Sequence, residues 1–270
     1  ALVSKLNAAH NKKMTTVIAS AGYGKSSLLA EWVRTFPKDI HSVWYNLEAN
    51  TQDPVVFFSY LIAGLRSRWP TFGAGLEAIL NRPAPLNPEQ VIISLFNALE
   101  VAIQDQTLVI ILDDYYLLND PTQIDPIINL LLSHLPKTVH LVISSRQRFN
   151  FSVAKLRAQD QLLELTEDEL RFSPDATSLL FGAGNLPATV QELIQRAEGW
   201  ITGLQLIRQV YQQSKPGELD QIMTRAPDWM RGVFEYLAEE VFEQLPIPLQ
   251  EFLIQSSLLE TLVAPDCDHI

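Results

Sequence analysis

The sequence predicts an α/β domain with a parallel β-sheet and flanking helices, followed by a smaller helical part. Three observations support this fold class. Short β-branched and apolar runs alternate with segments of helical period in the first half of the chain, which is typical of a parallel sheet covered by helices. The runs are almost continuously apolar, as strands buried on both faces are. After about residue 170 only helical patterns follow.

Four segments are predicted to be central strands, and one more is a candidate fifth strand. Each is short, rich in Val, Ile and Leu, and followed by a polar or glycine-containing stretch. The four segments are residues 15–20 (TTVIAS), 42–47 (SVWYNL), 107–112 (TLVIIL) and 140–144 (HLVIS), and the fifth is 162–165 (LLEL).

The predicted helices have recognisable start signals. In the first half, an Asp or Asn stands at the N-cap and proline at the first helical position, where its missing N–H is not needed. Two of these starts also carry Gln three residues after the cap, as in a capping box. The starts are 53–54, 87–88 and 120–121 in the first half and 173–174, 187 and 199–200 in the second; further helical segments cover 228–244 and 249–262, after a linker-like stretch at 213–227.

The excess of acidic residues limits the kinds of partner that this chain can bind. Its 270 residues contain 20 Lys and Arg against 31 Asp and Glu, a formal net charge of −11. Because phosphate neutralisation needs clustered Lys and Arg, we expect no direct nucleic-acid binding by this chain. With 47% hydrophobic and 19% charged residues, the composition is that of an ordinary globular protein able to bury a core.

Compartment signals favour the cytoplasm. The one cysteine, Cys267, cannot close an internal disulfide, which fits a reducing environment. The first 20 residues lack the features of a signal peptide, and no apolar stretch approaches the ~20 residues that cross a bilayer. We therefore expect a cytoplasmic protein without a membrane partner. Both ends break off abruptly, so we also expect a piece of a longer protein.

A candidate phosphate-binding loop, ASAGYGKSS at residues 19–27, follows the first predicted strand and leads into a helical pattern. Small residues let backbone N–H groups wrap a phosphate, Lys25 can reach the β and γ oxygens, and the Ser26 hydroxyl can ligate Mg²⁺. The N-terminus of the following helix adds its N–H groups and dipole to the same anion site. The predicted nucleotide contacts are Ala21, Gly22, Tyr23, Gly24, Lys25, Ser26 and Ser27.

This loop departs from the full GxxxxGK[ST] pattern because Ala19 stands where the first Gly is expected. The N–H donors from Gly22 onward are unaffected by that change. The alternative interpretation is a glycine-rich turn between a strand and a helix, with Lys25 facing solvent. Tyr23 could cover the nucleotide or brace the loop.

An acidic pair, Asp113-Asp114, follows the strand at 107–112. In a parallel sheet these carboxylates lie at the carboxyl edge, where ligands of such folds bind. Asp113 would hold Mg²⁺, directly or through water, and Asp114 would orient or deprotonate an attacking water. The alternative is a solvated loop that happens to begin with two acids.

A third candidate is Arg146, which follows the strand at 140–144. An Arg at the same edge can reach a γ-phosphate and so distinguish a triphosphate from a diphosphate, because its planar fork matches phosphate oxygens. Arg148 lies further into the loop and competes for this role. The alternative is a surface Arg after a strand.

Together these motifs resemble the signal-transduction ATPases with numerous domains (STAND), which are P-loop NTPases, and among them the large ATP-dependent LuxR-type regulators. The resemblance runs through almost the whole chain. The stretches that carry it are AGYGKSSLLAEW, WYNLEANTQDPVVFFSYL, VIILDDYYLL, HLVISSR, LRAQDQLLELTEDELRF, EGWITGLQL and FEYLAEEVFEQLPIPLQEFLIQSSLLETL.

The resemblance implies a P-loop nucleotide-binding domain at 1–170, a helical domain at 171–227 and the beginning of a winged-helix domain at 228–270. Lys25 and Ser26 fall on the phosphate and Mg²⁺ positions. Asp113 falls on the Mg²⁺ carboxylate and Asp114 on its acidic partner, so that both would be catalytic. Arg146 falls on the first sensor of the nucleotide.

The resemblance also implies a mode of action. In the family, ADP keeps the protein closed and monomeric, and exchange for ATP with an inducer opens it and permits self-association. The inducer site and the DNA-reading helix-turn-helix would lie in C-terminal segments beyond this sequence. The family's Gly-x-Pro nucleotide contact matches residues 199–204 (GWITGL), which contain no proline. Gly199 is therefore a candidate contact, and the residue that touches adenine stays open.

Two other functions remain possible from the motifs. A ring-forming motor ATPase shares the phosphate loop and the acidic strand end. A scaffold that kept the fold and lost the nucleotide is supported by Ala19. Trp200 is more typical of a packed core than of adenine stacking, and the acidic run 167–169 is interpreted as a solvated turn.

Overall fold

The computed structural model describes residues 2–83, 85–104, 106–118, 121–182, 186–213, 242 and 245–257. The chain divides into two compact units, Ala1–Leu170 and Arg171–Ile270. The first contains a β-sheet and the described part of the second is helical. The predicted α/β fold class is thereby confirmed.

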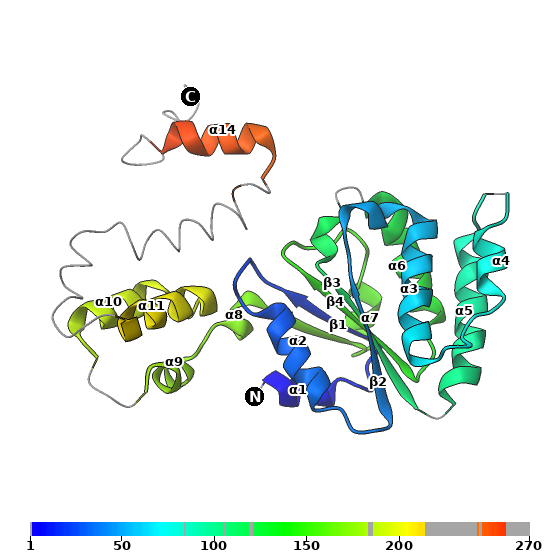
Figure 1. The fold of residues 1–270 in the computed structure, drawn as a ribbon, viewed down its shortest axis with the longest axis horizontal. Helices are drawn as coiled ribbons and strands as arrows, with labels where there is room; N and C mark the ends of the chain where they lie inside the picture. Colours follow the sequence, from blue (N-terminus) through cyan, green and yellow to red (C-terminus); the bar gives the residue numbers. More distant parts are fainter. Residues whose placement is uncertain are drawn as a thin grey trace. The chain divides into compact units, whose positions relative to one another are not determined.

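The first unit is built on one five-stranded parallel sheet with the strand order β2-β3-β4-β1-β5 (Figure 1). All five predicted strands are present, with no end shifted by more than two residues. Because β4 lies between β1 and β3, the carboxyl ends of these three strands are neighbours. The strands are β1 (Met14–Ile18), β2 (Ile40–Asn46), β3 (Thr107–Asp113), β4 (Val139–Ser145) and β5 (Leu162–Thr166).

Helices cover both faces of this sheet, with α1 and α2 on one face and α3, α5 and α6 on the other (Figure 1). Each of the first three crossovers between strands contributes a helix of at least ten residues. The helices are α1 (Leu2–Ala8), α2 (Lys25–Arg34), α3 (Pro54–Arg68), α4 (Leu76–Leu80), α5 (Pro88–Ile103), α6 (Ile124–His134), α7 (Ala154–Ala158) and α8 (Glu167–Leu170), with 3₁₀ turns η1 (Ala49–Gln52), η2 (Tyr115–Leu117) and η3 (Pro121–Gln123).

Two of the predicted helix starts are capped as expected. The Asp53 side chain accepts from the N–H groups of Val55 and Val56, at 2.8 and 3.1 Å, and Asn87 caps α5 in the same way. These acceptors satisfy N–H groups that the first helical turn leaves without a partner. The third predicted start, Asp120, lies outside the described residues.

Successive side chains along each strand point to opposite faces of the sheet, so the apolar core is divided between the two faces. Leu108, Ile110 and Leu112 of β3 pack into one large apolar cluster with α3, α5 and α6. On the opposite face Trp32 of α2 is fully buried, and its ring meets His140 of β4 edge-on at 6.3 Å. The sheet is therefore sandwiched between two helical layers, which leaves its carboxyl edge for the loops.

The described helices of the second unit are α9 (Pro174–Phe181), α10 (Ala188–Arg196), α11 (Ile201–Gln213) and α14 (Ile247–Ser256). Ser173 caps α9, as its position before Pro174 predicts. Val190 and Ile207 form a small core between α10 and α11. The predicted helix at 228–244 and nearly all of the linker at 213–227 lie outside the described residues. So does most of the predicted winged-helix start at 228–270, of which α14 is the described part.

In the described part of the chain, no helix is both long enough and apolar enough to cross a bilayer.

Candidate functional site

The predicted phosphate loop connects β1 to α2 at the carboxyl edge of the sheet. Gly22 and Gly24 have φ values of 77° and 73°, in the left-handed region that residues with a Cβ enter only with strain. Ala19 does not adopt a positive φ, and its N–H donates to the Ser145 carbonyl at 3.2 Å. The backbone therefore needs glycine at 22 and 24 and accepts alanine at 19.

The N-terminus of α2 faces this loop. Gly24 is its N-cap residue and offers no side-chain cap, so the first N–H groups of the helix are not occupied by a capping side chain. Ser26 and Ser27 are exposed in the first turn, whereas Tyr23 is buried. The buried ring supports a bracing role for Tyr23, and the exposed hydroxyls remain within reach of a ligand.

Lys25 turns back into the loop. Its Nζ donates to the carbonyl oxygens of Ala19 at 2.8 Å and Ser20 at 3.1 Å, and the residue is only 7% exposed. The solvent-facing alternative for Lys25 is therefore wrong. Burial and the positive charge of Arg146 lower the Lys25 pKa, while Asp114, Asp113 and Glu167 oppose that shift. The same five charged groups thus interact electrostatically around one loop.

The acidic pair lies at the end of β3. Asp113 is 2% exposed, and its Oδ1 accepts from the Asp114 N–H at 3.0 Å and from the Ser144 hydroxyl. Within the described residues both bonds go to Oδ1, so the lone pairs of Oδ2 remain for a water or a cation. Asp114 has φ 56°, a left-handed conformation that Asp tolerates better than most residues. The backbone therefore turns sharply at Asp114.

The end of β4 joins this pair to the loop. Ser144 bonds to Asp113 on one side, and the Ser145 carbonyl accepts from Ala19 on the other. Arg146 then leaves the strand, with its Cζ 4.6 Å from the centre of the Tyr116 ring. The structure thus brings together the three predicted motifs at one sheet edge, on the neighbouring strands β1, β4 and β3.

Glu167 is a site residue that the sequence interpretation missed. It begins α8 directly after β5, and its Oε2 accepts from the backbone N–H of Ser20 at 3.2 Å and from the Ser20 hydroxyl at 2.7 Å. The interpretation of residues 167–169 as a solvated turn is wrong for this residue. β5 pairs with β1, so the rule that placed Asp113 at the carboxyl edge applied to Glu167 as well.

Gly199 belongs to the second unit, whereas the site residues named so far belong to the first. Its φ is 79°, its carbonyl accepts from the Phe172 N–H at 3.0 Å, and a Cβ there would lie 2.7 Å from the Phe172 oxygen. Backbone packing alone therefore requires glycine here. Trp200 packs on Gly203, which supports the core interpretation of its ring. A contact of Gly199 with nucleotide stays a prediction.

No cluster of His, Cys, Asp and Glu suited to a metal ion is found within the described residues. A magnesium ion held mainly by phosphate oxygens and waters needs no such cluster, because it commonly takes only one or two protein ligands.

A parallel sheet in this order, with a glycine-containing phosphate loop between β1 and the next helix, defines a P-loop NTPase fold. Among solved structures, ORC1 of Aeropyrum pernix in complex with DNA has a TM-score of 0.50 and 15% identity, covering 96% of this chain and 71% of that chain. That likeness supports the fold. A STAND protein with a tetratricopeptide repeat sensor from Pyrococcus horikoshii has a TM-score of 0.49 and 19% identity, covering 98% of this chain and 35% of that one.

Sequence similarity points to transcriptional regulators. The HTH-type transcriptional regulator MalT of Klebsiella pneumoniae (strain 342) is 28% identical over 266 residues, 97% of this chain. MalT of Yersinia pestis (strain Pestoides F) is equally similar over the same length. The predicted resemblance to this group is confirmed. The chain spans 29% of the length of these relatives. No protein-family model matches the chain.

Proposed function

We propose that this chain is the nucleotide-binding core of a transcriptional regulator and acts as a switch controlled by ATP and ADP. The observation that carries the proposal is the meeting of Lys25, Asp113 and Arg146 at one sheet edge, on the adjacent strand ends β1, β3 and β4. Similarity to MalT regulators along 97% of the chain supports the same conclusion. Because −11 is an unfavourable charge for DNA, contacts to DNA belong to other segments of the regulator.

The residues present fit a nucleotide bound with magnesium. The loop supplies backbone N–H groups from Ala21 to Ser27 and the ammonium of Lys25, for which phosphate oxygens are stronger acceptors than two carbonyls. Ser26 and Asp113 would hold Mg²⁺. When bound, Mg²⁺ neutralises charge on the β and γ oxygens.

The proposal assigns one role to each of the remaining predicted site residues. Asp114 orients or deprotonates the attacking water at the edge of the site. Arg146 reports the γ-phosphate, which an ADP complex lacks, and Gly199 approaches the nucleotide from the helical unit. Hydrolysis is slow and serves to return the regulator to its closed state. Self-association follows ATP binding, and an inducer acts through a C-terminal domain outside this chain.

Calorimetric titration of the purified protein with ADP and ATP, each with Mg²⁺, tests the proposal. We expect saturable binding that falls ~100-fold or more in Lys25→Ala, because a partly desolvated charge-assisted contact is lost. Lys38→Ala, which removes an exposed Lys, is the matched control and retains affinity. Absence of binding in the parent, or equal affinity in Lys25→Ala, overturns the proposal.

Magnesium and turnover give two further readouts. Asp113→Asn keeps the side-chain shape, so we expect ADP binding without its enhancement by Mg²⁺. A fast ATPase rate that rises with protein concentration would favour the ring-forming motor instead. ADP retained through purification would exclude the nucleotide-free scaffold, whose one support, Ala19, stands where the backbone has no need of glycine.

A further inference from the structure

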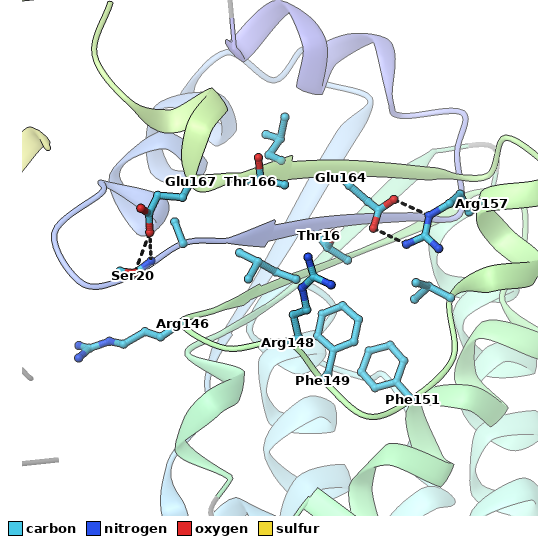
Figure 2. A pocket seen from close by; sticks show the side chains of 14 residues that line it. Thr16, Ser20, Arg146, Arg148, Phe149, Phe151, Arg157, Glu164, Thr166 and Glu167 are labelled. Carbon is cyan, nitrogen blue, oxygen red and sulfur yellow. Dashed lines mark hydrogen bonds and ion pairs between the residues drawn. The ribbon is translucent and has the colours of Figure 1, made fainter. Parts of the chain in front are cut away.

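A pocket of about 450 Å³ lies beside the phosphate loop, over β1 and β5 (Figure 2). Its walls include the register pairs Thr16–Glu164 and Ile18–Thr166 of these two strands. These positions share a sheet face with Met14 and Leu162, which belong to the cluster under α3, α5 and α6. The pocket therefore lies on the face opposite α1 and α2. Its volume is within the range of small-molecule sites, roughly 300 to 1,000 Å³.

The pocket exists because one crossover is short. The connection from β4 to β5 contains only the five-residue helix α7, which cannot cover the ends of β1 and β5. The Phe149 and Phe151 rings, stacked at 4.1 Å and nearly parallel, form an apolar wall in place of a helix. At the opposite wall Arg157 and Glu164 pair through two hydrogen bonds of 2.8 and 2.7 Å.

Thr16 is an unsatisfied polar group in this pocket. The residue is 1% exposed, and its Oγ1 has no hydrogen-bond partner within the described part of the chain. A buried hydroxyl left without a partner costs free energy, so such groups are rare unless a water or a ligand bonds them. Its neighbour Thr15, on the other face, bonds His140 Nε2 at 3.0 Å.

Arg148 supplies a positive charge at the same place. Its side chain projects toward the strand that carries Thr16, while Arg146 extends away from it (Figure 2). Among the described residues Arg148 forms no hydrogen bond, and the carboxylate within its field, Glu164, is already bonded twice by Arg157. The Arg157 hydrogen bonds hold the Glu164 pKa below its ordinary value. The guanidinium of Arg148 is thus available to an outside anion.

We propose that this pocket binds a small organic anion, with a carboxylate or phosphate group on Arg148 and Thr16 and a planar apolar body against Phe149. An Arg fork matches either anion, and the Thr16 hydroxyl donates to the oxygen that Arg148 leaves open. The size of the pocket suits one ring with a short acidic substituent. No atom of a nucleotide forms part of this site.

Occupancy of the pocket acts on the phosphate loop, because the two share a wall. Ala19 and Ser20 line the pocket, and their carbonyl oxygens hold Lys25. Glu167 lines it as well and anchors Ser20. A ligand that moves this wall changes the loop, so the anion and the nucleotide alter each other's affinity by the same factor.

Phenylacetate and phenyl phosphate are the probes, with benzyl alcohol as the neutral analogue, titrated by ligand-observed NMR into the nucleotide-free protein. We expect saturable binding of one or both acids and none of the alcohol. Arg148→Ala weakens the acid ~10-fold or more, as expected for loss of a charged hydrogen bond. Gln147→Ala, at the exposed neighbouring position, is the matched control and keeps the affinity.

Two comparisons separate this site from the phosphate loop. Lys25→Ala changes probe affinity by no more than the several-fold coupling if the acid occupies the pocket, and abolishes probe binding if the acid occupies the loop, which would overturn the proposal. Unchanged affinity in Arg148→Ala, or no saturation by either acid, overturns it too. With Mg-ADP present, we expect the bound acid to shift ADP affinity several-fold; an unaltered ADP affinity refutes the coupling. Failure of ADP to bind at all refutes the nucleotide switch and leaves the Arg148 test intact.

Discussion

The β2–β3 half of the sheet and its β1–β5 half are covered in different ways. Between β2 and β3 the chain inserts α3, α4 and α5, and the strand face beneath them is a continuous apolar core. Between β4 and β5 it inserts only α7, and the face beneath carries Thr16, Glu164 and Thr166. One half is closed by long helices and stabilises the fold, while the other leaves polar groups beside the phosphate loop.

The difference shows how crossover length distributes stability and chemistry within one sheet. A parallel sheet needs helices on both faces, and a crossover too short for a full helix leaves part of a face open. Polar and aromatic groups occupy much of that open face, beside the apolar Ile18 and Val153, because a wholly apolar face would expose its surface to water. Substitutions in the two halves should therefore change the free energy of unfolding by different amounts, and in some cases in opposite directions.

The largest loss of stability is expected in the closed half. Leu95 of α5 is fully buried, so Leu95→Ala should lower the free energy of unfolding by about 3 to 4 kcal/mol, through lost burial and a residual cavity. Val101→Ala on the same helix, at a position 78% exposed, should change it by less than ~0.5 kcal/mol. Urea unfolding measures both. Equal effects would mean that α5 does not close this half.

The next effect is a dependence of stability on pH that arises at β4, the strand between the two halves. Burial lowers the pKa of His140 to about 4, although its hydrogen bond to the Lys12 carbonyl opposes the shift. Between pH 6.5 and 4 the unfolded chain binds a proton at His140 that the folded protein does not bind. The contribution of the neutral imidazole to the free energy of unfolding is therefore complete above pH 6.5. It is lost as pH falls toward 4, by about 3 kcal/mol in total.

The midpoints of urea unfolding between pH 7 and 4.5 measure this contribution of His140 to stability. His140→Gln should flatten the fall in stability across that range, because the titrating group is gone. A parent-like slope in His140→Gln would assign the pH dependence to other groups.

A smaller cost is expected at the phosphate loop. Gly24 has φ 73°, so Gly24→Ala should lower stability by roughly 1 to 2 kcal/mol through backbone strain. Gly75→Ala is the control, because Gly75 has φ −90° and a Cβ there meets no atom within 4 Å. Thermal unfolding of the two variants, side by side, reports the difference. If both lose the same stability, the loop is not strained at Gly24.

The smallest effect should have the opposite sign. Thr16→Val replaces an unsatisfied buried hydroxyl by a methyl of similar shape, so we expect unchanged stability or a gain of up to about 1 kcal/mol. Thr15→Val removes a hydroxyl that bonds His140 and should cost about 1 to 2 kcal/mol. A larger loss from Thr16→Val than from Thr15→Val would contradict the assignment of the open face.

Much of the site was predictable because strand ends are predictable. Continuous apolar runs located β1, β3 and β4, and parallel pairing places the residues after each run at one edge. The position of Asp113 and Arg146 at the same sheet edge as the loop that carries Lys25 was therefore predictable from the sequence, and their roles toward a nucleotide stay predictions. Glu167 was missed because a run of three acids is usually solvated, and its partner, Ser20, lies 147 residues away in the chain.

The sequence by itself determined the fold class, the five strands and the phosphate loop, since local periodicity, helix caps and the glycines at 22 and 24 act over a few residues. Only the tertiary structure decided that β4 lies between β1 and β3, that Lys25 bonds back to Ala19 and Ser20, and that Thr16 faces an open pocket beside Arg148. These features depend on strand order and on the coverage of each sheet face. Both arise from contacts between segments distant in the chain, which no local pattern records.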